Sequence, residues 1–430
     1  MTDPSLPRQS LSRALLFVPV LALAALPAWT APPTAQAETF SVVIETPENG
    51  RISVRPPVPE DGKVPAGTVL TVTATPDAGY ALDSGFYAVP GRFGRMYHEA
   101  PTPTFEVVID QDKTISASFI EEEALEGFTV IQDVVYAQPG VKKLKYDVYT
   151  PDGARNLPLV IIVHGGGWRA NDEDIMRGLA RFFVRTGDYV VASIDYRWLG
   201  TADGDEVPNT MDDLIGDVYG AIAHIQEHAS EYGADATRIA LTGDSAGGHL
   251  SAAAANMTDM IGDGGFGTQP GIFQYEPSYR PPNKAIDQLR AEMASAIKVA
   301  APSYGVFGTE MLTASSERMG GGALSEGAAN AIAPIAQIPS PSERAVPQLM
   351  LRGAEDPLIR HGEVQAYTDA LEAAGQKAVY EQVEGASHAF FDWKPDARTR
   401  ATFEKYGVPN AEVMKAFFDA VLHADREGPH

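Results

Sequence analysis

One serine of this sequence stands where a nucleophile would be built. Ser245 lies in the only Gly-x-Ser-x-Gly motif of the chain, Gly243–Gly247. The apolar run 238–242 before the motif predicts a buried strand, and the small residues after it predict a helix. Such a turn lifts the serine onto the rim of a sheet, and its glycines permit the strained backbone. With 40 glycines in 430 residues, an ordinary strand–helix turn also explains the motif taken alone.

A serine hydroxyl becomes a good nucleophile when a base takes its proton, and histidine is the usual base. Among the histidines that follow Ser245, His388 is the candidate, because it comes just after a predicted strand, 378–383. It is therefore expected at the carboxyl edge of the sheet, where open α/β sheets hold their sites. The remaining ones are expected to pack in the interior or to be solvated: His249, His361, His423 and His430.

An acidic residue must orient this histidine. Asp356 directly follows another predicted strand, 348–351, so it is expected at the same edge of the sheet. Glu355 is its rival, and Asp392 is a further, less favoured alternative.

A glycine run is the third element of the expected site. The segment His164–Trp168 reads His-Gly-Gly-Gly-Trp and follows the apolar run 159–163. Residues without side chains expose their amides well, so the N–H groups of Gly166, Gly167 and Ala246 are predicted to form an oxyanion hole. Neither signature of a phosphate loop is present, although a plain flexible turn stays compatible with the run.

The elements that must position these residues follow an α/β pattern. Residues 128–136 and 143–149 predict two antiparallel strands, and buried-type apolar runs then alternate with helical patterns. This alternation predicts a mostly parallel sheet covered by helices on both faces. The expected elements are strand 159–163, a helix near 175–182, strand 189–194, helix 212–228, strand 238–242 and its helix, strand 296–301, strand 348–351, a helix through 364–371, strand 378–383 and helix 413–421.

Three segments depart from this pattern. The glycine- and proline-rich insert 256–292 is either a lid over the serine or a surface excursion. Residues 38–120 predict a small sandwich-like β domain without a catalytic cluster. The acidic stretch 121–127 predicts a linker, after which 128–430 form the α/β domain. The expected β strands are 40–44 and 51–54 as a hairpin around Asn49-Gly50, 69–74, and 105–109 with 114–119 as a second hairpin.

The first 37 residues predict a secretory signal peptide. Arg8 and Arg13 precede an apolar run that is too short to span a bilayer comfortably, and Ala35-Gln36-Ala37 is a small-x-small cleavage pattern. A secreted or periplasmic location is therefore expected.

Composition narrows the possible partners. The chain contains no cysteine, which excludes disulfides, thiolate nucleophiles and cysteine-ligated metals. The net charge of −24 disfavours binding to nucleic acid and to anionic membrane surfaces. No metal or organic cofactor is implied, and the sequence does not determine the oligomeric state.

The sequence from 128 to 423 resembles the α/β-hydrolase family, in particular HGGGW-type esterases near the hormone-sensitive-lipase and feruloyl/acetyl xylan esterase groups. Asp133–Tyr136, Asp195–Arg197 and Gly243–Leu250 carry the resemblance together with the His-Gly-Gly-Gly-Trp segment. It implies Ser245 as nucleophile, His388 as general base and then acid, and Asp356 as the residue that orients it. The insert 256–292 departs from the family pattern, so the substrate pocket does not transfer.

Residues 66–80 and 114–119 resemble the bacterial InlB B-repeat-like module, which occurs on exported proteins as a spacer or adhesion unit. We therefore expect a secreted serine carboxylic-ester hydrolase that acts on small or polymer-linked esters, plant polysaccharide esters among them. Attachment to a polymer or a cell surface through the β domain is compatible with this. An amide-cleaving enzyme (a formamidase or peptidase) and a non-catalytic adhesion protein are the alternatives. Trp168 either lines the acyl pocket or packs beside the glycine run.

Overall fold

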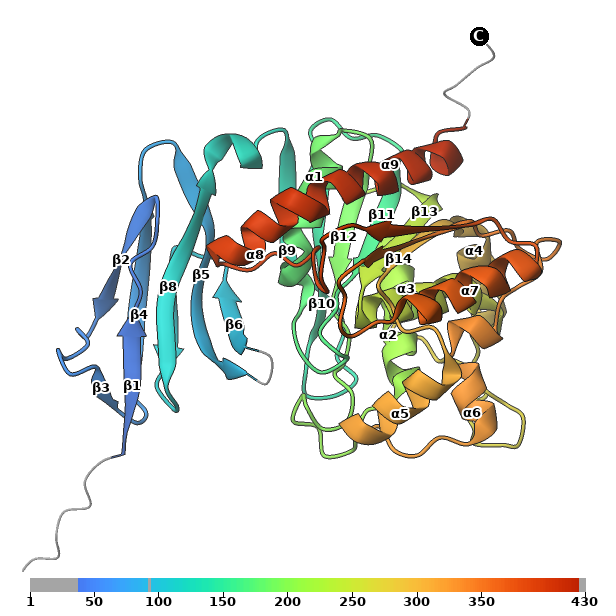
Figure 1. Cartoon of the computed structure of the whole chain (residues 1–430), viewed down its shortest axis with the longest axis horizontal. Helices are drawn as coiled ribbons and strands as arrows, with labels where there is room; N and C mark the ends of the chain where they lie inside the picture. Colours follow the sequence, from blue (N-terminus) through green and yellow to red (C-terminus); the bar gives the residue numbers. More distant parts are fainter. Residues whose placement is uncertain (1–37, 92–93, 425–430) are drawn as a thin grey trace, which may run out of the picture.

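The computed structural model describes residues 38–91 and 94–424, and the predicted signal peptide, 1–37, lies outside them. Strands β1–β8 form one part of the molecule, here called the β module (Thr39–Glu121). The remainder, here called the α/β domain (Phe128–Leu422), lies beside it (Figure 1). Between them the short helix η1, Glu122–Leu125, occupies most of the predicted linker.

The β module is a sandwich of two sheets with strand orders β3-β1-β8-β5-β6 and β2-β4-β7. Apolar residues from both sheets, such as Val42, Val72 and Ile115, are buried together between them. The expected small β domain is therefore confirmed. The strands are β1 Thr39–Ile44, β2 Gly50–Arg55, β3 Lys63–Pro65, β4 Val69–Pro76, β5 Tyr80–Gly91, β6 Gly94–Ala100, β7 Thr104–Val108 and β8 Lys113–Glu121.

Both predicted hairpins of this module are wrong. β1 pairs with β3 and β8, whereas β2 pairs with β4 in the other sheet. Likewise β7 pairs with β4, and β8 pairs with β1 and β5. In each case the turn carries the chain from one sheet to the other. A turn signal shows where a strand ends, but burial of apolar residues between the two sheets decides its partner.

The sequence pattern also missed β5 and β6. In β5 the polar residues Asp83 and Ser84 and the small Gly85 interrupt the apolar alternation, yet all three are buried. Asp83 and Ser84 are buried with polar partners, which the α/β domain supplies in part, as described below.

The α/β domain is built on a larger sheet in the order β16-β15-β14-β13-β11-β12-β10-β9. β9 and β10 are antiparallel, as predicted, and β10 also pairs antiparallel with β12. The other pairs are parallel, which confirms the expected fold class. The strands are β9 Phe128–Ala137, β10 Leu144–Pro151, β11 Leu157–Val163, β12 Val190–Ile194, β13 Ala234–Asp244, β14 Ile297–Ser303, β15 Gln348–Gly353 and β16 Ala378–Val383.

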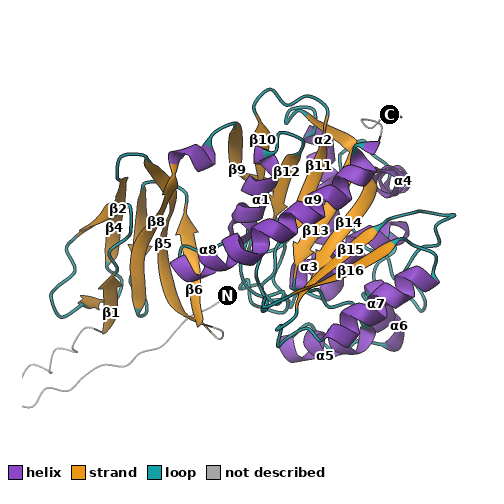
Figure 2. Ribbon diagram, turned by 45° about the horizontal axis from the view of Figure 1, so that its top comes forward, coloured by secondary structure: helices purple, strands orange, loops and turns teal. Residues whose placement is uncertain are grey.

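Helices cover both faces of this sheet (Figure 2). α1 and α9 pack against each other and the sheet on one face, while α2, α3 and α7 lie on the other. Every residue of β11 and of α3 is buried, so the elements around the serine form the centre of the core. The helices are α1 Arg177–Arg185, α2 Met211–His228, α3 Ala246–Asn256, α4 Ile286–Ala296, α5 Thr309–Met319, α6 Glu326–Ala331, α7 His361–Ala373, α8 Ala397–Thr402 and α9 Val408–Leu422.

The insert 256–292 is partly helical, because α4 begins at Ile286. The Ser278 amide donates to the Gly216 carbonyl of α2 at 3.2 Å, and Tyr275 donates to the carbonyl of Ala331. The segment is thus anchored on α2 and α6. Among the described residues no hydrogen bond joins it to Ser245, and its action as a lid stays a prediction.

Candidate active site

Ser245 occupies the sharp turn between β13 and α3. Its φ of 52° lies in the left-handed region, which is strained for a residue with a side chain. The turn closes against β11, because a Cβ atom on Gly247 would lie 2.0 Å from the Val163 carbonyl oxygen. Only glycine fits there, so the motif's spacing follows from the close approach of helix and strand.

Ser245, His388 and Asp356 form a hydrogen-bonded series. His388 Nδ1 lies 2.8 Å from Asp356 Oδ2, and His388 Nε2 lies 2.9 Å from Ser245 Oγ. A carboxylate only accepts, so Nδ1 carries the proton and Nε2 accepts from the serine hydroxyl. The Asp356 side chain is fully covered, whereas that of His388 is 14% exposed. The imidazole is therefore held from one side and remains accessible from the other.

Asp356 is stabilised as a carboxylate. Burial opposes its ionisation, but hydrogen bonds from His388 and from the amides of Ile359 and Leu358 outweigh this effect and lower its pKa. The rival acids lie elsewhere: Glu355 is exposed, and Asp392 pairs with Lys394 at 2.9 Å. The structure thus brings Asp356, and neither alternative, to the imidazole.

Among the other histidines of the predicted set, His249 has a clear structural role. It is fully buried, accepts a hydrogen bond from Trp168 Nε1 at Nδ1 (3.2 Å), and donates from Nε2 to the Ile332 carbonyl (2.9 Å). Burial lowers its pKa to about 4, so it stays neutral at physiological pH. Trp168 is therefore packed beside the glycine run, and its contact with an acyl group stays a prediction.

His361 and His423 make their contacts away from Ser245. His361 begins α7, as expected, and its ring nitrogen lies 3.1 Å from the Tyr380 hydroxyl. His423 is buried with its ring against Tyr189. His430 lies outside the described residues.

The predicted oxyanion donors belong to two connected loops. Gly166 and Gly167 have φ values of 121° and 60°, and Ala246 directly follows the serine. Within the described part of the chain, the amides of these three residues donate to no protein acceptor. The Gly165 amide, in contrast, donates to Asp244 Oδ1 at 2.6 Å and so ties the glycine run to the serine turn. The role of these three amides as an oxyanion hole stays a prediction.

Two residues of the site were missed by the sequence reasoning. Asp244 is buried, and burial, together with the nearby Asp392, raises its pKa well above the usual value. Tyr304 packs its ring edge-on against His388, with 4.9 Å between ring centres, and accepts a hydrogen bond from the Phe391 amide. Asp244 stands inside the serine motif and could have been found there. Tyr304 comes shortly after the predicted strand 296–301, and this position at the carboxyl edge of the sheet could have marked it.

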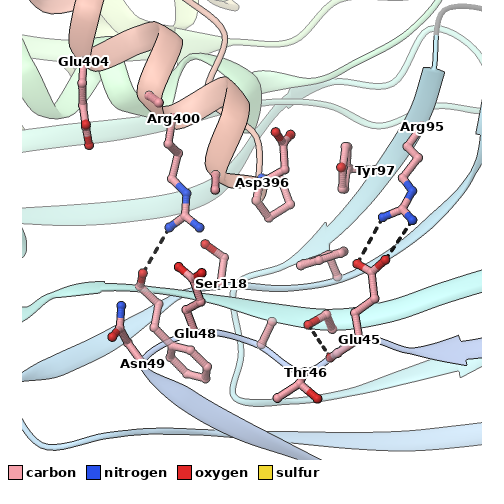
Figure 3. Close-up of a pocket in the computed structure, with 17 residues that line it drawn as sticks. Glu45, Thr46, Glu48, Asn49, Arg95, Tyr97, Ser118, Asp396, Arg400 and Glu404 are labelled. Atoms are coloured by element: carbon pink, nitrogen blue, oxygen red, sulfur yellow. Dashed lines mark hydrogen bonds and ion pairs between the residues drawn. The ribbon is translucent and has the colours of Figure 1, made fainter.

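A cavity of about 400 Å³ lies apart from this site, where the β module meets α8 (Figure 3). Glu45 and Arg95 pair on its β-module side, and Asp396 and Arg400 line it from the α/β domain. None of the residues in the serine–histidine–aspartate series lines it. It is a feature of the junction between the two parts.

Residues 38–91 and 94–424 show no group of three or more histidine or carboxylate side chains that could hold a metal ion. Over the same ranges, no helix combines the length and apolarity needed to cross a bilayer.

Comparison with known families assigns both parts of the chain. Residues 146–371, more than half of the chain, match the model of BD-FAE, which comprises α/β-hydrolase esterases of the hormone-sensitive-lipase-like group. The chain belongs to the BD-FAE family. Residues 40–123 match the divergent InlB B-repeat domain, so the resemblance noted for the β module is also confirmed.

Curated relatives of this BD-FAE protein are named as esterases. The carboxylesterase NlhH of Mycobacterium tuberculosis is 35% identical over 133 residues, which cover 31% of this chain and 40% of the relative. The esterase LipQ of the same species is 29% identical over 288 residues, which cover 63% of this chain and 60% of the relative. The chain thus spans about half the length of such relatives, and less than that for some.

Among solved structures, esterase 2 of Thermogutta terrifontis superposes with a TM-score of 0.50 at 22% identity, covering 68% of this chain and 94% of that one. At this identity the likeness supports the fold, in agreement with the α/β-hydrolase arrangement described above.

Proposed function

We propose that this BD-FAE protein is a serine carboxylic-ester hydrolase that works through an acyl-enzyme. The observation that carries the proposal is the series in which His388 lies 2.9 Å from Ser245 Oγ and 2.8 Å from Asp356. Such a series makes a serine nucleophilic, because the imidazole takes the hydroxyl proton as the bond to carbon forms.

In the acylation step, Ser245 Oγ attacks the ester carbonyl carbon while His388 Nε2 accepts the hydroxyl proton. Asp356 stabilises the resulting imidazolium through the hydrogen bond at Nδ1. The carbonyl oxygen gains negative charge, and the amides of Gly166, Gly167 and Ala246 supply donors for it. His388 then protonates the departing alcohol oxygen, and the acyl group remains on Ser245.

In the deacylation step, water takes the place of the alcohol. His388 accepts a proton from the water as its oxygen attacks the acyl carbon, and the second tetrahedral intermediate uses the same amides. Collapse of this intermediate releases the carboxylic acid, and the proton returns to Ser245. Each step uses only groups of the chain and water.

We further propose that the enzyme is exported and acts on esters attached to polysaccharide. The predicted signal peptide, 1–37, and the match of 40–123 to a divergent InlB B-repeat domain support the location. The β module, which lies beside the enzyme domain, supports a polymeric substrate (Figure 1).

Hydrolysis of p-nitrophenyl acetate by the full chain tests the first proposal. Ser245→Ala is expected to lower kcat by at least about 10⁴-fold, because removal of the nucleophile leaves only binding and oxyanion stabilisation. Ser342→Ala is the matched control and should retain full activity, because Ser342 is exposed and its hydroxyl bonds to that of Ser340. Full activity of the Ser245→Ala variant would show that Ser245 is not the nucleophile.

A fluorophosphonate probe provides a second readout, since it labels an activated serine without needing a preferred ester. Wild type and the control should be labelled and the Ser245 variant should not. A non-catalytic adhesion protein would not react in any form.

Matched ester and amide substrates then separate an esterase from an amidase. The rate on acetylated xylan, compared with the rate on a soluble acetate ester, tests the polymeric substrate.

A further inference from the structure

The loop that carries His388 runs from the active site to the β module. It leaves β16, and a few residues after the histidine it reaches Trp393, ahead of α8. The Phe391 amide donates to the Tyr304 hydroxyl at 3.1 Å, and the Trp393 amide donates to the Ile175 carbonyl at 2.8 Å. The loop is therefore fixed from outside, by its neighbours, rather than by regular structure of its own.

One of these external supports belongs to the β module. The Trp393 indole Nε1 donates to Asp83 Oδ2 at 3.0 Å, although Asp83 lies on β5, 310 residues away in the sequence. The Asp83 side chain has no exposed surface, and Trp393 is 7% exposed. This hydrogen bond is thus buried in the junction between the two parts.

Asp83 is itself held by two arginines of α1. Arg177 donates to both carboxylate oxygens, from Nε at 3.1 Å and from Nη2 at 3.0 Å, and Arg181 donates from Nη1 at 2.6 Å. Arg177 also pairs with Glu99 of β6 at 2.6 Å. Burial would raise the pKa of Asp83, but the two guanidinium groups outweigh it and hold that pKa far below its usual range.

Such a network does not suit a module that swings freely on a linker. Separating the two parts would leave Arg177, whose side chain is 4% exposed, without its buried partners, and breaking a buried pair in this way is strongly destabilising. On the α8 side, Arg400 Nη1 donates to the Phe119 carbonyl at 3.2 Å, which adds a second tie across the junction. The module is therefore docked in one position.

We propose that the β module is part of the catalytic unit and that Asp83 is a positioning residue for His388, acting through Trp393. The inference rests on the proposed function, because the base must stay within hydrogen-bonding distance of Ser245. A displacement of about 1 Å from productive geometry can cost about 10²-fold in rate. The InlB-type module thus has a task inside this enzyme besides any attachment.

Two variants approach the same contact from opposite sides. Asp83→Asn removes the charge in the module. Trp393→Phe removes the indole donor and part of the ring that packs on Phe403, and it leaves the hydrogen bonds of Asp83 with Arg177 and Arg181 in place. We expect each to lower kcat on p-nitrophenyl acetate by about tenfold with KM within about twofold. The rate of fluorophosphonate labelling of Ser245 should fall in parallel. Arg95→Gln, which breaks an exposed ion pair within the same module, is the control and should leave kcat unchanged.

The double variant shows whether Asp83 acts through Trp393. If it does, Asp83→Asn in the Trp393→Phe background lowers kcat no further, because the shared contact is already lost. If the losses in kcat of the two single variants add in the double variant, Asp83 does not act through Trp393. A fall in kcat for Trp393→Phe alone, with Asp83→Asn fully active, would overturn the role of the module.

Hydrogen exchange of the segment 385–396 supplies a readout that does not depend on activity. We expect faster exchange in the folded Asp83→Asn protein than in wild type and in Arg95→Gln. If Asp83→Asn speeds exchange in this segment but the wild type hydrolyses no ester, the proposed function has failed and the contact between Asp83 and the loop stands. If the wild type is active and Asp83→Asn changes neither kcat nor exchange, the positioning role of Asp83 has failed and the proposed function stands.

Discussion

Two buried aspartates, Asp83 and Asp356, contact the same loop, at Trp393 and at His388, and different partners keep them ionised. Asp83 receives hydrogen bonds from two arginines and the Trp393 indole. Asp356 receives them from the imidazole and two backbone amides. Both pKa values are lowered against the effect of burial. Asp83 is held by arginines, which stay charged, so it is a static anchor. Asp356 is held in part by an imidazole, which can gain and lose a proton.

A third buried aspartate, Asp244, completes the contrast. Burial and the proximity of Asp392 raise its pKa well above the usual value, and it accepts the Gly165 amide. Burial by itself therefore does not identify a catalytic acid. The partners of the carboxylate decide whether it anchors a domain, orients a base or holds a loop.

The largest effect expected from this comparison is at Asp356. Asp356→Asn should lower kcat on p-nitrophenyl acetate by about 10⁴-fold, because an amide no longer holds the imidazole in the tautomer that accepts from Ser245. Glu355→Gln is the matched control, since Glu355 is exposed and bonds to the loop only through its backbone amide. Inactivation of the control, with an active Asp356 variant, would reassign the acid.

In the junction between the two parts, Glu99, the second acidic partner of Arg177, should make stability depend on pH. Burial, opposed by Arg177, raises its pKa to about 7 in the folded protein, from an ordinary value of 4.5. The folded state then binds more protons than the unfolded state, so stability falls as pH rises from about 4.5 to 7, by on the order of 3 kcal/mol. Glu99→Gln keeps an acceptor for Arg177 and should reduce the slope in urea unfolding measured from pH 4.5 to 8, while other buried carboxyl groups with a raised pKa, such as Asp147, retain the rest of it. An unchanged slope would show that folding does not raise the pKa of Glu99.

The smallest effect is expected at Asp244. Asp244→Ala leaves the Gly165 amide without its acceptor, at a cost of about 1–3 kcal/mol, or about 10–100-fold in kcat/KM if the glycine run moves. Asp244→Asn retains an acceptor oxygen and resembles the protonated carboxyl, so it should stay close to wild type. Wild-type kcat/KM in the alanine variant would show that the glycine run does not depend on this bond.

The sequence predicted the fold of the α/β domain well, for a physical reason. Parallel strands buried on both faces read as continuous apolar runs, and β11, β13 and β15 stand out in this way. Residues at the carboxyl ends of such strands meet at one edge, so Ser245 and Asp356 could be placed near each other without coordinates. The β module was predicted less well, because the partner of a short strand depends on which sheet buries its apolar face.

Local chemistry, then, is what the sequence by itself determined: a serine in a turn where Gly247 allows helix and strand to touch, glycines that expose amides, and a histidine after a strand. The tertiary structure alone decided which carboxylate meets His388, that Trp168 bonds to His249, and that Asp83 reaches Trp393. Turn and strand preferences act between residues that are neighbours in sequence. Hydrogen bonds and ion pairs act between groups that are neighbours in space, and Asp83 and Trp393 are 310 positions apart in the sequence.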